Sequence, residues 1–335
     1  MANVQDVSVG WKKETTFGTA VTVDRWLEFD DESLDYGWEA KQGDSLRVGS
    51  GVALGSRRSW PTGTGGGDIT VPLTSKGMGT LLELAFGQGA STLVSGSTYQ
   101  QNFTLVDGLL PSATIQKGLV DAAGTVHPYT FAGCSCSGFE INIPQAGIAT
   151  LKTSWDLRSL STATAYAAPS YPSGGVQFDW GMAAPAYAGT LTAPTTNALA
   201  SGTTAIANVR DFNLKVDNKL ATDRYNMGQA GLKAKQVPGR REISGSITVE
   251  YTDDVLRDAM LGKTAAPLTV TMTSAESLST GFSTFQLVLP QIWVTGALPK
   301  VNGGNLITTS FAFTATDNGT VEPLYCCLRS SDTAL

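Results

Sequence analysis

The chain has 335 residues, more than one hydrophobic core usually supports, so two domains are the default expectation. The net charge is −6 and charged residues make up only 16% of the chain, which argues against a protein that grips nucleic acid through clustered Lys and Arg. Gly, Ser, Thr and Ala are abundant and good helix formers are sparse, which favours an all-β chain.

The sequence also argues against membrane insertion. No apolar run approaches the ~20 residues that a spanning helix needs. The start, MANVQDVSVG, lacks the charged and then apolar pattern of a signal peptide, so we expect a protein made and kept in a cytosol. The cysteines form two close pairs, Cys134 with Cys136 and Cys326 with Cys327, whose spacing predicts reduced thiols on strands and no metal site.

The first predicted unit begins with a strand, a long polar segment and a second strand. In ESLDYGW at 32–38 the apolar residues alternate with the period of two that places them on one sheet face. Residues 39–56 have no clear period, and loops of that length in compact domains are usually functional or disordered. Arg57 and Arg58 then lead the next strand. We therefore expect residues 39–56 to be an assembly element that is poorly ordered in the monomer.

A short helix is predicted over residues 75–86. Thr74 or Ser75 can cap its start, and Gly87 suits the left-handed position after its end. Its apolar residues fall at i, i+3, i+4 and i+7, which makes one stripe: Met78, Leu81, Leu82 and Ala85. The strands expected after it are NFTLV at 102–106, SATIQ at 112–116, and a hairpin of CSCSGFEINI at 134–143 with IATLKTSWD at 148–156.

The chain then repeats this order of elements. VRDFNLKV at 209–216 alternates, residues 217–239 form a second long polar segment with the same expected role as the first, and Arg240 and Arg241 lead a strand. A helix is predicted over 252–261, capped by Thr252, with Gly262 after its end and an apolar stripe of Val255, Leu256, Ala259 and Met260. Strands are expected at LTVTM, FSTFQLVLP and a hairpin from QIWVTG to NLITTSFAFTATD.

The repetition predicts a mainly β fold of two tandem β-sandwich modules, each with one short flanking α-helix. The alternative is chance similarity between two common strand-to-helix units, and the matched order of the elements argues against it. We expect a first module at 1–170, a second at 206–325 and a C-terminal tail at 326–335. Residues 171–205, rich in Ala, Thr, Ser, Pro and Gly, are the expected connection, although VQFDWG at 176–181 is compatible with a strand that completes the first module.

No catalytic, metal or cofactor site is predicted. The sole histidine, His127, precedes a proline, and no G-x-S-x-G elbow supplies a nucleophile for it. The glycine cluster at 63–67 is followed by Asp68 and a strand, not by the Gly-Lys-Ser/Thr of a phosphate loop. The paired acids at 30–31 and 253–254 build no metal cage by spacing. We therefore predict a structural protein, not an enzyme.

Several segments together resemble the tail tube (major tail) proteins of long-tailed bacteriophages. The resemblance spans most of residues 7–318. It rests on WKKETTFGTA at 11–20, the arginine-led strand and helix at 57–87, LLPSATIQKG at 109–118, FAGCSCSGFEINIP at 131–144, and VDN at 216–218 followed by GRREISGSITV. Each segment is weakly specific alone, but their order is much more so.

The resemblance implies a virion protein, made in the host cytoplasm, that self-assembles into rings stacked as a hollow tail tube. Double-stranded DNA would pass through the lumen without sequence-specific contacts, and a negative wall would repel its phosphates. The tape measure and tail terminator proteins are the other implied partners, no cofactor is implied, and a double module would close as a trimer with pseudo-sixfold symmetry. The candidate assembly contacts are Arg47, Arg57, Arg58, Arg224, Tyr225, Lys233, Arg240 and Arg241.

One alternative stays open at this stage. A tandem β-sandwich adhesin or carbohydrate-binding module would use some of the seven tryptophans to hold sugars. The helix predicted in both repeats argues against it, because plain immunoglobulin-like modules do not require that element.

Overall fold

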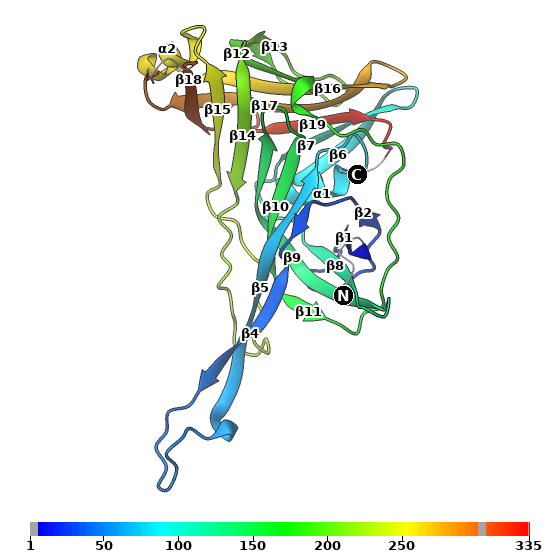
Figure 1. The fold of residues 1–335 in the computed structure, drawn as a ribbon, viewed down its shortest axis with the longest axis vertical. Coiled ribbons are helices and arrows are strands. Elements are labelled where there is room, and N and C mark those ends of the chain that lie inside the picture. The colour runs from blue at the N-terminus through cyan, green and yellow to red at the C-terminus, as the bar shows by residue number, and fades with distance from the viewer. Residues whose placement is uncertain (1–5, 301–305, 334) are drawn as a thin grey trace.

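A computed structural model describes residues 6–300, 306–333 and 335. The chain is mainly β, as predicted, and is drawn out along one axis by a long projection (Figure 1). Its N-terminal part contains β1 (Ser8–Lys13), β2 (Arg25–Trp26), β3 (Asp31–Glu32), β4 (Asp35–Gln42), β5 (Arg58–Pro72), α1 (Gly79–Phe86), β6 (Gly87–Ser95), β7 (Thr98–Leu105), β8 (Ala113–Val120), β9 (Val126–Ile143), β10 (Thr150–Leu157) and β11 (Ser159–Ser161).

The C-terminal part begins with β12. It contains β12 (Ala183–Thr192), β13 (Ser201–Ala205), β14 (Val209–Asp217), β15 (Glu242–Glu250), α2 (Val255–Gly262), β16 (Ala266–Ser277), β17 (Phe282–Thr295), β18 (Thr308–Ala315) and β19 (Tyr325–Ser330). The predicted connection, 171–205, therefore includes β12 and β13, and β12 pairs with β16. The predicted tail from residue 326 begins inside β19, which pairs with β17 and β7.

One antiparallel sheet runs through both parts of the chain. In the N-terminal part the strands are ordered β4-β5-β10-β9, and in the C-terminal part β14-β15-β18-β17. The two quartets are joined because β9 pairs with β14, from Ile143 opposite Phe212 to Gly138 opposite Asp217. We call the result the eight-strand sheet.

The second layer of each part also has a regular order. The N-terminal layer is β2-β1-β8-β9-β11, and the C-terminal layer is β13-β12-β16-β17-β19. β9 and β17 are long enough to serve both layers. β9 carries a bulge at Ser137, opposite Ser154 and Trp155 of β10, close to where it passes from one layer to the other. The β6–β7 hairpin crosses between the parts, because β7 pairs with β19.

The first helix is shorter than predicted but buries the predicted stripe. It begins after Met78, so neither Thr74 nor Ser75 caps it, and Gly87 ends it in the left-handed conformation with φ 102°, as predicted. All four stripe residues are fully buried. The helix packs against β1, β6, β7 and β9.

The second helix is far more exposed. It begins after Asp254, and the hydroxyl of Thr252 accepts a hydrogen bond from the Asn208 amide at 2.8 Å, so the predicted cap is wrong. Gly262 is helical, and Lys263 takes the left-handed conformation with φ 50° in its place. Of the predicted stripe, only Leu256 is buried.

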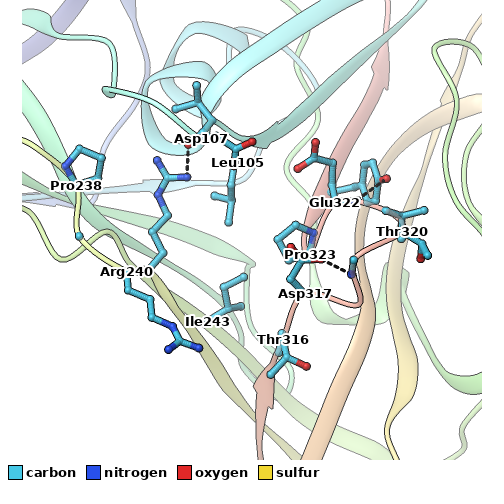
Figure 2. Close-up of a pocket in the computed structure, with 17 residues that line it drawn as sticks. Leu105, Asp107, Pro238, Arg240, Ile243, Thr316, Asp317, Thr320, Glu322 and Pro323 are labelled. Carbon is cyan, nitrogen blue, oxygen red and sulfur yellow. Dashed lines mark hydrogen bonds between the residues drawn. The ribbon is translucent and has the colours of Figure 1, made fainter.

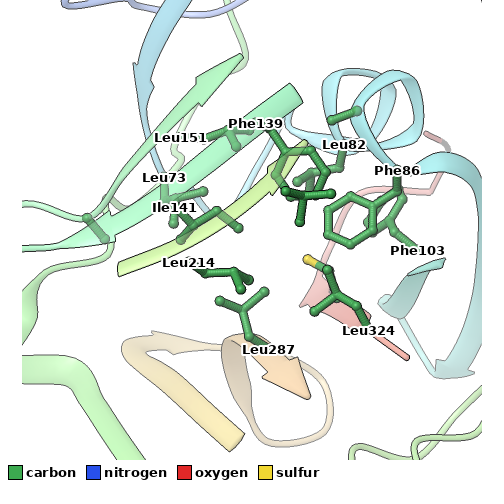
Figure 3. Close-up of a cluster of buried hydrophobic side chains, with 14 of the residues drawn as sticks. Leu73, Leu82, Phe86, Phe103, Phe139, Ile141, Leu151, Leu214, Leu287 and Leu324 are labelled. Carbon is green, nitrogen blue, oxygen red and sulfur yellow. The ribbon is translucent and has the colours of Figure 1, made fainter. Parts of the chain in front are cut away.

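The hydrophobic core is continuous between the two parts of the chain. Phe86 of α1 lies against Phe103 and Phe139, with a ring-centroid distance of 4.6 Å to the latter. Leu214 and Leu287 of the C-terminal part belong to the same cluster (Figure 3). Apolar burial of this kind is the main stabilising contribution to folding, so the two parts stabilise each other.

Candidate functional site

The eight-strand sheet has one apolar face and one polar face. Alternate residues, such as Ile141 and Leu214, are buried in the core, while their neighbours point away from it. Polar side chains pair across the strands: the Lys152 ammonium lies 2.8 Å from the Asp68 carboxylate, and the Asn213 amide donates to Glu140. Acids outnumber bases on this face, with Asp31, Asp68, Glu140, Asp211, Asp217, Glu242 and Glu250 against Lys152, Arg210, Lys215 and Lys219.

Both outer edges of the eight-strand sheet are open within the described residues. β4 pairs with β5 alone, and residues 293–295 of β17 pair with β18 alone. Trp38 of β4 lies opposite Gly63 of β5. The N–H of Gly63 donates to the Gly231 carbonyl and its C=O accepts from the Tyr225 hydroxyl, so both groups point away from β4. Opposite residues of an antiparallel pair share this orientation, so the N–H and C=O of Trp38 face the open edge.

A projecting hairpin extends from the sheet below β10. We call it the arm: residues 37–64, in which β4 and the first residues of β5 pair with each other beyond the last β10 partner at Gly65 (Figure 1). Its tip carries Leu46, Val48 and Val52, all strongly exposed. Apolar side chains gathered on such a tip are typical of an interaction surface.

Two exposed tryptophans lie on the arm. Trp38 is 45% exposed and Trp60 is 53% exposed, and the Arg58 guanidinium lies 4.9 Å from the Trp60 ring centroid. Together with Ala230 they line a shallow cavity of about 490 Å³. Aromatic and arginine side chains of this kind are enriched in protein interfaces.

The second long segment does not project. Residues 218–241 lie against the base of the arm, where the Gly231 carbonyl accepts from Gly63 N–H at 3.0 Å and the Tyr225 hydroxyl donates to the Gly63 carbonyl at 2.9 Å. The Lys233 carbonyl accepts from Arg158 Nε at 3.0 Å. These contacts hold the segment in place within one chain, which differs from the poorly ordered element expected from its sequence.

A buried polar group anchors this segment. The Lys233 ammonium pairs with Asp156 Oδ1, and the Gln236 amide donates to Asp156 Oδ2. The Ser135 hydroxyl donates to Gln236 Oε1 at 2.9 Å. Each of these side chains has a hydrogen-bond partner, which offsets the cost of burying polar groups.

The second arginine pair borders a pocket. The pocket has a volume of about 900 Å³ and lies between the end of β7, residues 238–241 and the β18–β19 connection (Figure 2). Arg240 is exposed, whereas Arg241 donates to the Val106 carbonyl and leaves Nε and Nη2 without a partner among the described residues. Burial lowers the pKa of Arg241, and the nearby charge of Asp107 acts against this.

The predicted contact residues thus fall into three places. Arg47, Arg57 and Arg58 lie on the arm, Arg224, Tyr225 and Lys233 lie on residues 218–241, and Arg240 and Arg241 lie at the pocket.

Sequence reasoning missed Asp156 and Gln236, which no pattern distinguishes from surface residues. It also placed Trp38 on the strand's apolar face, although this side chain is exposed.

The described residues do not bring the reactive side chains together. His127 Nε2 lies 2.9 Å from the Asp121 carboxylate, and both side chains are in part exposed. All four cysteines are buried and free, and burial raises the pKa of Cys136 and Cys327 to about 12, so these thiols stay protonated. No group of three or more metal-ligating side chains occurs in the described ranges.

A comparison with protein families decides the assignment. The family model described as phage tail tube protein matches residues 4–315. The chain belongs to the phage tail tube protein family. No curated protein matches it. This phage tail tube protein is thus a structural component of the tail, from a family of structural proteins rather than enzymes. None of its described helices is long and apolar enough to cross a membrane.

Proposed function

We propose that the protein closes into rings that stack as the tail tube, and that each chain is two copies of one ring-forming module. The observation that carries this is the β9–β14 junction. It joins two quartets of the same strand order edge to edge, which is the kind of contact that a ring of such modules requires.

The matched strand orders support duplication. β4-β5-β10-β9 corresponds to β14-β15-β18-β17, and β2-β1-β8-β9-β11 corresponds to β13-β12-β16-β17-β19. α1 and α2 each follow the second strand of their quartet. The two parts differ in the β6–β7 hairpin. It lies between α1 and β8 in the N-terminal part, whereas only three residues separate α2 from β16 in the C-terminal part.

In this proposal the open edges pair between chains. The β17 end of one copy joins β4 of the next, as β9 joins β14 within the chain, and this removes the exposed edges. Three double modules close the same circle as six single ones, so the ring is a trimer with pseudo-sixfold symmetry. Covalent linkage makes half of the module contacts intramolecular and favours closure.

The polar face of the eight-strand sheet then lines the lumen. Its excess of acids repels phosphates, so double-stranded DNA passes during ejection without binding to the wall. The tape measure protein would occupy this lumen before DNA enters, and a terminator protein would cover the last ring. The protein is made in the host cytoplasm and ends in the virion.

Electron microscopy of the purified chain tests this function. We expect rings and tubes from the native chain at high concentration. Trp38→Pro removes an N–H that faces the open edge, so it should abolish rings, whereas Trp38→Ala keeps the N–H and should retain them. Dispersed monomers that bind glycans through Trp38 and Trp60 would instead favour the carbohydrate-binding alternative.

A further inference from the structure

We propose that the exposed face of α2 is the docking surface for the arm tip of a second copy of this chain. This inference rests on the proposed stacking and names its two contacting surfaces. It assigns to α2 a role that α1, its counterpart in the N-terminal part, does not have.

The two helices differ in what covers them. The apolar residues of α1 are 0% exposed, because β6 and β7 follow the helix directly and pack on it. α2 has no such hairpin, and its Val255 and Leu261 are 44% and 59% exposed. The same position in the fold is therefore covered in one part of the chain and bare in the other.

The exposed face of α2 also carries acidic side chains. Asp253, Asp254 and Asp258 lie around its first turns, and Arg257 is the one base among them in this stretch. Arg257 is already engaged, with its guanidinium 2.7 Å from the Asp258 carboxylate and in contact with Asp254 as well. Asp258 lies between Val255 and Leu261 at i+3 spacing, so a partner for this surface should offer both apolar side chains and positive charge.

The arm tip has that chemistry. Leu46, Val48 and Val52 supply exposed apolar side chains, and Arg47 and Arg57 have no ion-pair partner in the described part of the chain. Only one acid, Asp44, lies between residues 43 and 57. The two surfaces are therefore complementary in both hydrophobicity and charge.

The fold separates these surfaces in the way that stacking requires. α2 and the arm tip lie at opposite ends of the long axis (Figure 1), so the tip cannot reach α2 of its own chain. A head-to-tail contact between copies uses each surface once and leaves the next pair free. Such heterologous contacts propagate without limit, which suits a tube of stacked rings.

Cysteine crosslinking between two variants tests the contact directly. We would mix Val48→Cys chains with Leu261→Cys chains, assemble them and oxidise. Both positions are exposed, and the native cysteines are all buried, so a disulfide-linked dimer reports contact between different copies. Thiols held together reach effective concentrations of about mM, so we expect at least about tenfold more dimer than with Leu109→Cys, an exposed control away from α2.

A charge exchange provides the second readout. Arg47→Glu should raise the protein concentration at which tubes assemble by about tenfold, because the contact loses one ion pair of moderate strength. Arg47→Glu combined with Asp258→Arg should restore it. Tubes that form normally but crosslink no better at Leu261 than at Leu109 would overturn the α2 contact and leave the tube function standing. Absence of tubes from the native chain would instead contradict the proposed function itself.

Discussion

The ammonium of Lys233 lies 2.5 Å from the carboxylate of Asp156, and the two side chains are only 6% and 8% exposed. This pair joins residues 218–241, which connect β14 and β15, to β10 of the N-terminal part. It fixes the segment against the base of the arm. A pair so deeply buried is far more sensitive to the loss of one partner than a surface ion pair.

Loss of the Lys233 charge should therefore destabilise the fold. Lys233→Met leaves an unpaired buried carboxylate, and we expect the free energy of unfolding to fall by about 3–5 kcal/mol. Lys235→Met, two residues away, should change it by less than about 0.5 kcal/mol. Lys233→Met with Asp156→Leu should recover part of the loss. Chemical denaturation measures all three, and equal losses for both single variants would contradict the role of the pair.

Acid should weaken the contact between β16 and residues 75–76, which precede α1, through Glu276. Burial acts to raise the pKa of Glu276, but hydrogen bonds from the Ser75 and Ser283 hydroxyls, each at 2.7 Å, and the charge of Lys76 outweigh it, so the pKa is lowered. A carboxylate whose pKa is lowered in the folded state stabilises the fold. This stabilisation is fully present at a pH above the ordinary glutamate pKa, and it is lost as the pH falls through the lowered pKa of the folded state.

The variant Glu276→Gln should remove this acid-dependent contribution. Its free energy of unfolding should be lower than that of the native chain at neutral pH, and the two should converge as the pH falls through that window. Hydrogen bonding to Lys41 lowers the pKa of Glu39 too, but on the exposed arm, where solvent screens the pair. Glu39→Gln is thus the control. Denaturation across the acid range would refute the assignment if both variants gave the same profile.

Shortening the arm should separate stacking from folding. Replacement of residues 43–56 by an Asn-Gly turn retains the β4 edge and removes Leu46, Val48 and Val52. We expect an unchanged melting temperature and rings that no longer stack, as seen by circular dichroism and electron microscopy. Shortening of 218–241 serves as the contrast, because it removes the buried Lys233 and should lower the melting temperature. Normal tubes from the arm variant would exclude the arm from stacking.

The number of chains in a ring follows from the doubled sheet. If each chain supplies two quartets of strands, rings released from tubes should contain three full-length chains. Native mass spectrometry measures this directly. Six chains per ring would exclude the trimer and leave the tail tube assignment intact.

Local patterns in the sequence determined much of the secondary structure. Alternating side chains predicted strands such as β9 and β14, and the stripe from Met78 to Ala85 predicted the buried face of α1. Gly87 ends that helix because a residue without Cβ adopts the left-handed conformation without strain. These features depend on neighbours in the chain, which is why a single sequence contains them. The order of the segments also determined the family.

The tertiary structure decided which edges and surfaces meet. Pairing of β9 with β14 and of β7 with β19 joins segments far apart in the chain, and no local period specifies a partner for a strand edge. The long segment 217–239, which has no clear period, predicted an assembly element that is poorly ordered in the monomer, but burial of Lys233 depends on Asp156, a residue 77 positions away. The apolar residues of α1 are all buried, whereas Val255 and Leu261 of α2 are exposed, because burial depends on what packs against a helix as well as on its own sequence.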